Sequence, residues 1–346
     1  MNASILPGRH LAMLATLALG ATFLLGACTP STGGQSGSAG GKTPKPPKIT
    51  LGEYFVHPTD LTVEGLTGQK ITSTTGSEAR WSYLPGQQPF NDFLAETVNA
   101  QLQAQAETRG AVYTPEAHDR NAEWLERGCV PGTTALTGRE ILDDPRLSLP
   151  AGSDTELTVA CDTILASGPN YGQKLRFVRG TASEVASDFV EIIYTNTETG
   201  DVARGRDLIN PEALPTLYDA VMDLAKIERP MSGDQVLAPD SATLSDLGES
   251  LSNVGFDANG DILVTVDQNF IAFLAAGDPK VEILPTTLKI PAARATEILT
   301  PLGAGISTSM AEALPWSGPA AVPSGREYVD CDLVACVAVT YDDGPS

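Results

Sequence analysis

The pattern of apolar and polar positions predicts a sheet-rich unit with a few amphipathic helices. Period-two alternation, which is typical of antiparallel strands, occurs in residues 49–83, and further strands are predicted at 155–166, at 174–179 and in the β-branched run 189–195. Apolar residues recur at helical spacing in residues 89–107 and again after Asn210 and Pro211. Asn210 is a good N-cap, and Pro211 suits the first turn of a helix.

Two turn signals divide the second half of the chain. Thr199-Gly200 follows a β-branched run, and Asn259-Gly260 lies in the middle of Phe256 to Val264; both predict hairpins. Further strands are predicted at 281–284 and 287–290, and a short helix at 291–299. Strands that outnumber helices and are joined by hairpins are typical of the α+β class, with helices packed on an antiparallel sheet.

The N-terminus predicts an exported, lipid-anchored protein. An apolar run from Leu11 to Leu25 is too short to span a membrane comfortably but suits a signal peptide. It ends in Leu25-Gly26-Ala27-Cys28, which resembles a lipobox, so residues 1–27 are interpreted as a lipoprotein signal peptide and Cys28 as the lipidated residue. The alternative is an ordinary secretory signal with a chance cysteine. We expect an extracytoplasmic protein held on the cell membrane by its lipid, with residues 28–48 as a flexible tether.

Charge and cysteine count agree with this location. A net charge of -21 without a basic stripe argues against nucleic acid as a partner. Four of the five cysteines remain once Cys28 is lipidated. Outside the cytoplasm we expect them to form two disulfides, Cys129 with Cys161 and Cys331 with Cys336. A metal site is the alternative, but the CxxC or histidine spacing that it needs is absent.

Residues 49–302 resemble the extracellular module of RsiV-type anti-sigma factors. The resemblance lies in Phe189 to Ala220, with its strand, turn and helix, and in Phe256 to Ile290, which contains Asp267-Gln268 and Ala275-Ala276-Gly277. It implies an α+β fold and two classes of partner, a cell-wall glycan or a lytic enzyme such as lysozyme.

The C-terminal residues carry a second resemblance. Residues 303–327 are rich in Ala, Pro, Gly and Ser and predict a linker. Residues 328–346 begin with an apolar strand and reach Thr340-Tyr341-Asp342-Asp343-Gly344-Pro345, which resembles the first motif of NodB-like polysaccharide deacetylases. The resemblance implies that Asp342 is a general base and Asp343 a ligand to a divalent metal, zinc or similar. The alternative is a surface turn, because Asp, Gly and Pro all favour turns.

Two hypotheses of function follow. In the first, the chain is the N-terminal portion of a membrane-anchored peptidoglycan deacetylase and contains the first strand of an incomplete (β/α) barrel. We expect it to be inactive and to bind no metal tightly, because its histidines, His10, His57 and His118, do not form the family's later H-x-x-x-H-like motif. In the second, the chain is a non-catalytic lipoprotein. In both, we expect residues 49–302 to fold independently of the tail.

Overall fold

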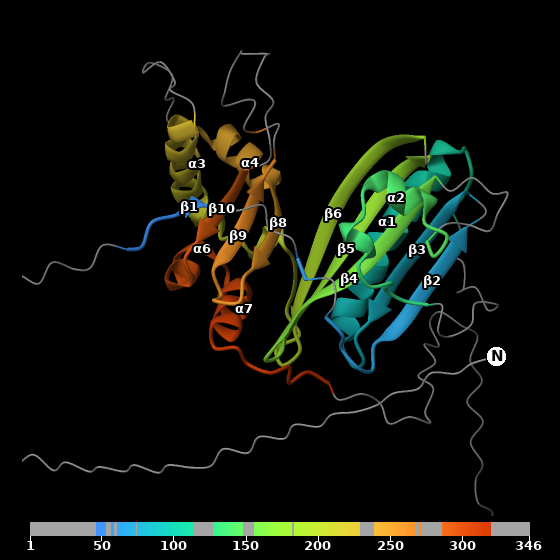
Figure 1. Cartoon of the computed structure of the whole chain (residues 1–346), viewed down its shortest axis with the longest axis horizontal. Coiled ribbons are helices and arrows are strands. Elements are labelled where there is room, and N and C mark those ends of the chain that lie inside the picture. Colours follow the sequence, from blue (N-terminus) through green and yellow to red (C-terminus); the bar gives the residue numbers. More distant parts are fainter. Residues whose placement is uncertain are drawn as a thin grey trace, which may run out of the picture. The chain divides into compact units, whose positions relative to one another are not determined.

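The computed structural model has an α+β architecture in which helices pack against two sheets (Figure 1). These elements belong to one compact unit that begins at Pro46. The residues that the structure describes are 46–52, 57–58, 61–73, 75–113, 127–147, 156–181, 183–228, 239–267, 270 and 286–319.

The larger sheet has six strands in the order β2-β3-β4-β5-β6-β7. Their bounds are Thr67–Ser73, Ser77–Tyr83, Leu157–Ser167, Asn170–Thr181, Glu184–Asn196 and Val202–Arg204. All neighbouring strands are antiparallel except β3 and β4, which are parallel. The exception arises because β3 and β4 are separated by a helical connection and not by a hairpin, and a long crossover permits parallel pairing.

Helix α1 (Gln88–Thr108) covers one face of this sheet. Its apolar stripe, which includes Phe90 and Leu94, packs on Trp81 of β3 and on Tyr171 and Phe177 of β5. The Asn91 side chain fixes the turn before the helix, because its amide oxygen accepts from Leu84 N–H at 2.9 Å and its amide group donates to Leu84 O at 3.0 Å. The helix predicted at 89–107 is therefore confirmed, with its buried face against the sheet.

The smaller sheet has four antiparallel strands in the order β1-β10-β9-β8. Their bounds are Thr50–Leu51, Thr286–Ile290, Ile262–Val266 and Leu251–Phe256. The predicted Asn259-Gly260 hairpin joins β8 to β9, and the Thr199-Gly200 hairpin joins β6 to β7. Gly260 and Gly200 both have positive φ, as these turns require. The strand predicted at 281–284 lies outside the described residues.

A second apolar core joins the smaller sheet to the far end of the larger one. Val264, Val266 and Leu288 of the smaller sheet share this core with Ile192 and Tyr194 of β6. Helices complete this core. They are η3 (Arg206–Leu208), η4 (Pro211–Ala213), α3 (Leu214–Glu228), α4 (Ser241–Ser250), α6 (Ala295–Ile298) and α7 (Pro301–Ala311), and the short η5 (Ala292–Arg294) leads into α6. The Tyr194 hydroxyl donates to Val254 O at 2.7 Å, which connects β6 to β8. The second predicted helix is η4 followed by α3, with Asn210 as its N-cap.

A short segment covers the remaining face of the larger sheet. It contains η2 (Thr133–Ala135) and α2 (Gly138–Asp143), with Ile141 and Leu142 packed on Ala160 and Val178. Thr137 and Glu140 form a capping box at the start of α2.

The prediction of a linker from residue 303 is wrong for residues 303–311, because α7 runs through them. Ile306 is fully buried, and the Ser307 hydroxyl donates to Gly260 O at 2.6 Å. The small residues that suggested a linker permit close packing, since a Cβ on Gly303 would lie 3.0 Å from Leu299 Cβ. The hairpin that α7 contacts is equally tight, because a Cβ on Gly260 would lie 2.2 Å from Ser307 O. The next residues also dock, since Gly168 O accepts from Ser317 N–H at 2.9 Å and Trp316 packs on Tyr171 with ring centroids 5.9 Å apart.

Candidate functional site

A groove of about 120 Å³ lies where the edge of the larger sheet meets the start of β8. Its polar lining comes from β6 (Glu191), from the end of β7 and η3 (Arg204, Arg206), and from α4 and β8 (Glu249, Asn253). We call this the edge groove. η3 spans Arg206–Leu208 and turns the chain away from the sheet. The groove therefore begins where β7 ends at Arg204 and no longer pairs with β6.

A backbone hydrogen bond fixes the end of β7. Gly205 N–H donates to Ile192 O at 2.7 Å, and after it the chain leaves β6. Arg204 stays in place because its guanidinium donates to Glu191 Oε2 at 2.9 Å and lies 4.8 Å from the centre of the Phe93 ring. This ion pair is partly buried, so it orients both side chains at the mouth of the groove.

Asn253 lines the groove with a backbone conformation that few residues adopt. Its φ is +55°, and the pairing of β8 with β9 shifts register between Ser252 and Gly255. Asn tolerates the left-handed region better than most residues, and bulges of this kind re-aim side chains beside functional sites. Here the bulge places Asn253 Oδ1 3.0 Å from His57 Nε2.

His57 is a buried, neutral support for Asn253. Only 3 % of its surface is exposed. Burial lowers the pKa of His57 to about 3, and the positive charge of Lys174 acts in the same direction. A neutral ring whose Nε2–H faces the Asn253 oxygen donates this hydrogen bond. The contact therefore holds the Asn253 side chain at any pH near neutrality.

A row of buried polar groups lies behind the groove on the larger sheet. Asp162 of β4 is directly opposite Lys174 of β5 in the strand register. Burial raises the pKa of Asp162, although it accepts hydrogen bonds from Thr134 and from Gly132 N–H. Burial also lowers the pKa of Lys174, and the nearby Arg176 lowers it further. These groups fix the η2 segment on the sheet.

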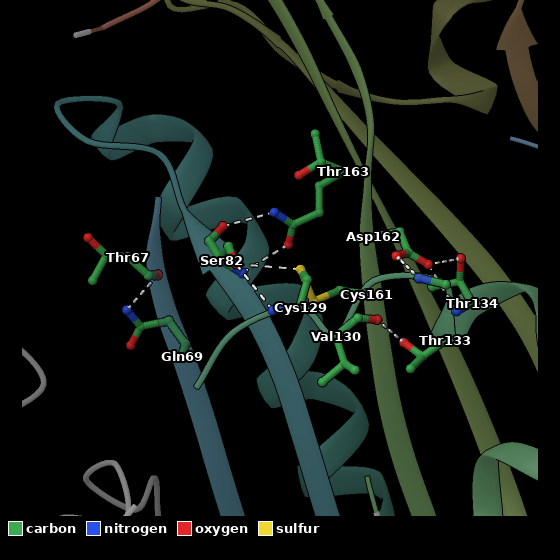
Figure 2. The surroundings of a disulfide bond; sticks show 12 residues. Thr67, Gln69, Ser82, Cys129, Val130, Thr133, Thr134, Cys161, Asp162 and Thr163 are labelled. Carbon is green, nitrogen blue, oxygen red and sulfur yellow. Dashed lines mark hydrogen bonds between the residues drawn. A yellow bond between two sulfur atoms is a disulfide. The ribbon is translucent and has the colours of Figure 1, made fainter. Parts of the chain in front are cut away.

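The predicted Cys129–Cys161 disulfide is present. Its sulfur atoms are 2.04 Å apart and its Cα atoms 4.9 Å apart. Figure 2 shows the bond between β4 and the segment that leads to η2, next to Ser82 of β3. Ser82 Oγ also accepts from Cys129 N–H at 3.3 Å. The disulfide thus attaches the 127–147 segment to the sheet, in a structural position away from the edge groove.

The other predicted site residues lie outside the described part of the chain. They are Cys28, Cys331, Cys336, Asp342 and Asp343. Within the described ranges, no three His, Cys, Asp or Glu side chains gather closely enough to hold a metal ion. The same residues contain no helix that is long and apolar enough to cross a membrane.

The groove residues carry weak sequence signals. Asn253 and Gly255 stand two apart in a strand, a combination that is compatible with a bulge. His57 is far from His10 and His118 along the chain, so no spacing of histidines singles it out. Arg204 and Glu191 are 13 residues apart and meet because β6 and β7 form the hairpin that Thr199-Gly200 predicts.

Comparison with known proteins identifies no family for this chain. No protein-family model matches it, and no curated protein matches it. Among solved structures, it is similar to a DUF3298 family protein from Pseudomonas aeruginosa PAO1, with 16% sequence identity and a TM-score of 0.30. That match covers 72% of this chain and 97% of the other.

Proposed function

We propose that residues 46–319 form a non-catalytic binding module of a lipid-anchored envelope protein, and that the edge groove binds its ligand. The observation that supports this is the convergence of carboxylate, guanidinium and amide groups from three parts of the chain in one groove. A concave site with a few convergent polar groups is the default place for a ligand. The strained Asn253, which His57 holds in place, adds to this support.

The ligand classes come from the resemblance to the RsiV-type module. They are a cell-wall glycan and a lytic enzyme such as lysozyme. Glu249 and Arg206 are the exposed charged groups of the groove, and Arg206 lies 3.9 Å from the exposed Asp207 carboxylate. Glu191 and Arg204 are less exposed and pair with each other. Glu249 and Arg206 are therefore the side chains that we expect to contact the ligand.

Binding of soluble peptidoglycan fragments and of lysozyme, measured by calorimetry on the soluble module, tests this proposal. We expect one probe to bind and the double variant Arg206→Gln/Glu249→Gln to weaken it at least about tenfold, since hydrogen bonds to charged groups contribute about 1.5 to 3 kcal/mol each. The control is Glu198→Gln, an exposed carboxylate on the β6–β7 turn. Equal binding by the double variant, or no binding of either probe to the parent protein, would show that the proposal is wrong.

A second function, deacetylation of cell-wall polysaccharide, is favoured by the motif at residues 340–345. In this proposal Asp343 would be a ligand to a divalent metal such as zinc, which would supply Lewis-acid activation of water, and Asp342 would be the group that accepts the proton. We expect acetate release from acetylated chitooligosaccharide to stay at background, because the chain lacks the histidines of the family's later motif. Metal-dependent release that disappears in Asp342→Asn would contradict this expectation.

A further inference from the structure

We propose that the outer edge of β6, next to the edge groove, is a strand-addition site for an extended basic segment of a partner protein. The inference rests on the proposed function, because it uses the same groove, and it names the class of ligand. In strand addition, main-chain hydrogen bonds supply affinity, and pockets for alternate side chains supply specificity.

The first observation is an unpaired strand edge. β7 pairs only with Ile193, Tyr194 and Thr195 of β6. Outside these pairs, Ile192 O accepts from Gly205 N–H and Asn196 N–H donates to Asp201 O, so residues 192 and 196 face β7. Backbone groups alternate along an antiparallel strand, so the N–H and C=O of Val190 and Asp188 point to the same side. Among the described residues, none pairs with these outward groups.

The second observation is that this edge is open to solvent. Glu184, Val185, Ala186 and Asp188 are exposed. The sheet also carries the usual protection against unselective pairing, because a bulge lies between Ser187 and Val185 and charged side chains flank it. The bulge limits regular pairing to the part of β6 after Ser187. This is the part that leads directly into the edge groove, which Phe189, Val190 and Ile192 also line.

The third observation is the size of the groove. Its volume of about 120 Å³ is well below the roughly 300 to 1,000 Å³ of pockets that enclose a whole small molecule. A groove of this size suits one side chain of an added strand. Glu249, Arg206 and Asn253 surround this position. A short strand that continues the line of β7 would place one side chain there while its backbone pairs with Val190 and Asp188.

The charge of the chain favours a partner protein over a second copy of this chain as the occupant of the β6 edge. The net charge of -21 opposes the pairing of two copies at a shared edge. Glu184 and Glu249 are exposed at the two ends of the site. Asp188 pairs with Arg176 at 2.6 Å, and the positive charge of Arg206 lies 3.9 Å from the Asp207 carboxylate. A strand of net positive charge is therefore the complementary occupant.

The probe is a synthetic hexapeptide of alternating valine and lysine, added to the soluble module. We expect its binding to slow hydrogen exchange of the Val190 and Asp188 amides, and to leave unchanged that of the Glu198 amide, which donates to Asn196 Oδ1 at 2.9 Å on the β6–β7 turn. A hexapeptide of alternating valine and glutamate should bind at least about tenfold more weakly. Equal protection of all three amides, or equal affinity for the two peptides, would overturn the inference.

A proline substitution isolates the backbone contact. Val190→Pro removes an N–H that faces the open edge, where proline is tolerated, whereas Val190→Ala keeps it. We expect Val190→Pro to lose peptide binding about tenfold or more while Val190→Ala retains it. If Val190→Pro does not fold, the exchange experiment on the parent protein decides.

Glycan binding at the groove without amide protection by the peptide would refute strand addition and leave the proposed function intact. Peptide-induced dimerisation, or a dimer without peptide, would instead identify a second copy as the occupant.

Discussion

Asn253 and His57 show how single residues shape the edge groove. A residue with φ of +55° needs local support, and here a buried ring supplies it through one hydrogen bond. The ring has to remain neutral, because a charged imidazole would be costly at this depth and next to Lys174. The groove therefore depends on the protonation of a residue that does not line it.

We predict that His57 makes the protein less stable in acid. Its unfolded pKa is 6.5 and its folded pKa about 3, so the unfolded chain binds a proton first. The contribution of the neutral His57 to the free energy of unfolding is therefore present above pH 6.5, and it is lost as the pH falls from 6.5 towards 3. Between pH 6.5 and pH 5 the loss should be about 2 kcal/mol. Urea unfolding of the parent and of His57→Gln at pH 7 and pH 5 measures it, and parallel losses in both proteins would contradict the prediction.

We predict that glycine at position 253 gives a more stable protein than alanine, although alanine is usually the more stabilising of the two. Alanine is strained in the left-handed region by about 1 to 2 kcal/mol, whereas glycine is not. Both lose the hydrogen bond to His57, so the difference between them reports backbone conformation alone. Asn253→Gly should therefore be more stable than Asn253→Ala by about 1 kcal/mol in chemical denaturation. Equal stability of the two variants would mean that this position is unstrained.

At the scale of elements, two connections hold the α+β unit together. The disulfide attaches the segment with η2 and α2 to β4, and α7 with its following residues attaches the smaller sheet to the β4–β5 turn. Asn170, the first residue of β5, donates through its side-chain amide to Ser309 Oγ of α7 at 3.1 Å. Neither connection lies at the edge groove, so we expect both to contribute to the free energy of unfolding and not to ligand binding.

Truncation tests the contribution of α7. A chain that ends at Leu302 loses the fully buried Ile306 and the contact of Trp316 with Tyr171. Removing a buried aliphatic side chain alone costs about 2 to 5 kcal/mol. We expect this chain to melt well below a control that ends at Pro319. Identical melting temperatures would support the linker that the sequence predicted.

Loss of the disulfide should lower the free energy of unfolding and leave ligand binding at the edge groove unchanged. The two cysteines are separated by 32 residues, and closing such a loop contributes about 3 to 4 kcal/mol in the chain-entropy model. We expect Cys129→Ala/Cys161→Ala to unfold at a lower denaturant concentration by this amount. Reduction of the parent protein serves as the matched comparison. A stability that is insensitive to both changes would show that the bond contributes little.

At the scale of the whole molecule, we propose attachment to a membrane through Cys28. Acyl chains on this cysteine would hold the protein on the bilayer, because each buried CH₂ contributes about 0.8 kcal/mol. Cys28→Ala should therefore move the protein from the membrane fraction to the soluble fraction. Cys129→Ala, which leaves the lipobox intact, controls for changes in folding. Retention of Cys28→Ala in membranes would refute the lipid anchor.

The sequence alone determined the local elements. Residues 89–107 carry an apolar stripe with a period of 3.6, and Asn259-Gly260 needs the positive φ of a hairpin turn, so both were predictable from short-range chemistry. The cysteine pair 129 and 161 was predictable from the expected oxidising compartment. These features depend on neighbours in the chain or on a count of residues.

Tertiary structure alone decided α7, the parallel β3–β4 pair and the edge groove. The Gly, Ala and Ser residues of α7 resemble a linker until their close contact with the Asn259-Gly260 hairpin is known. β3 and β4 are neighbours only after the intervening chain has packed on the sheet. His57 and Asn253 are 196 residues apart, and their hydrogen bond exists only because a bulge turns one side chain towards the other. Contacts across such distances depend on how elements pack, and periodicity along the chain does not record that packing.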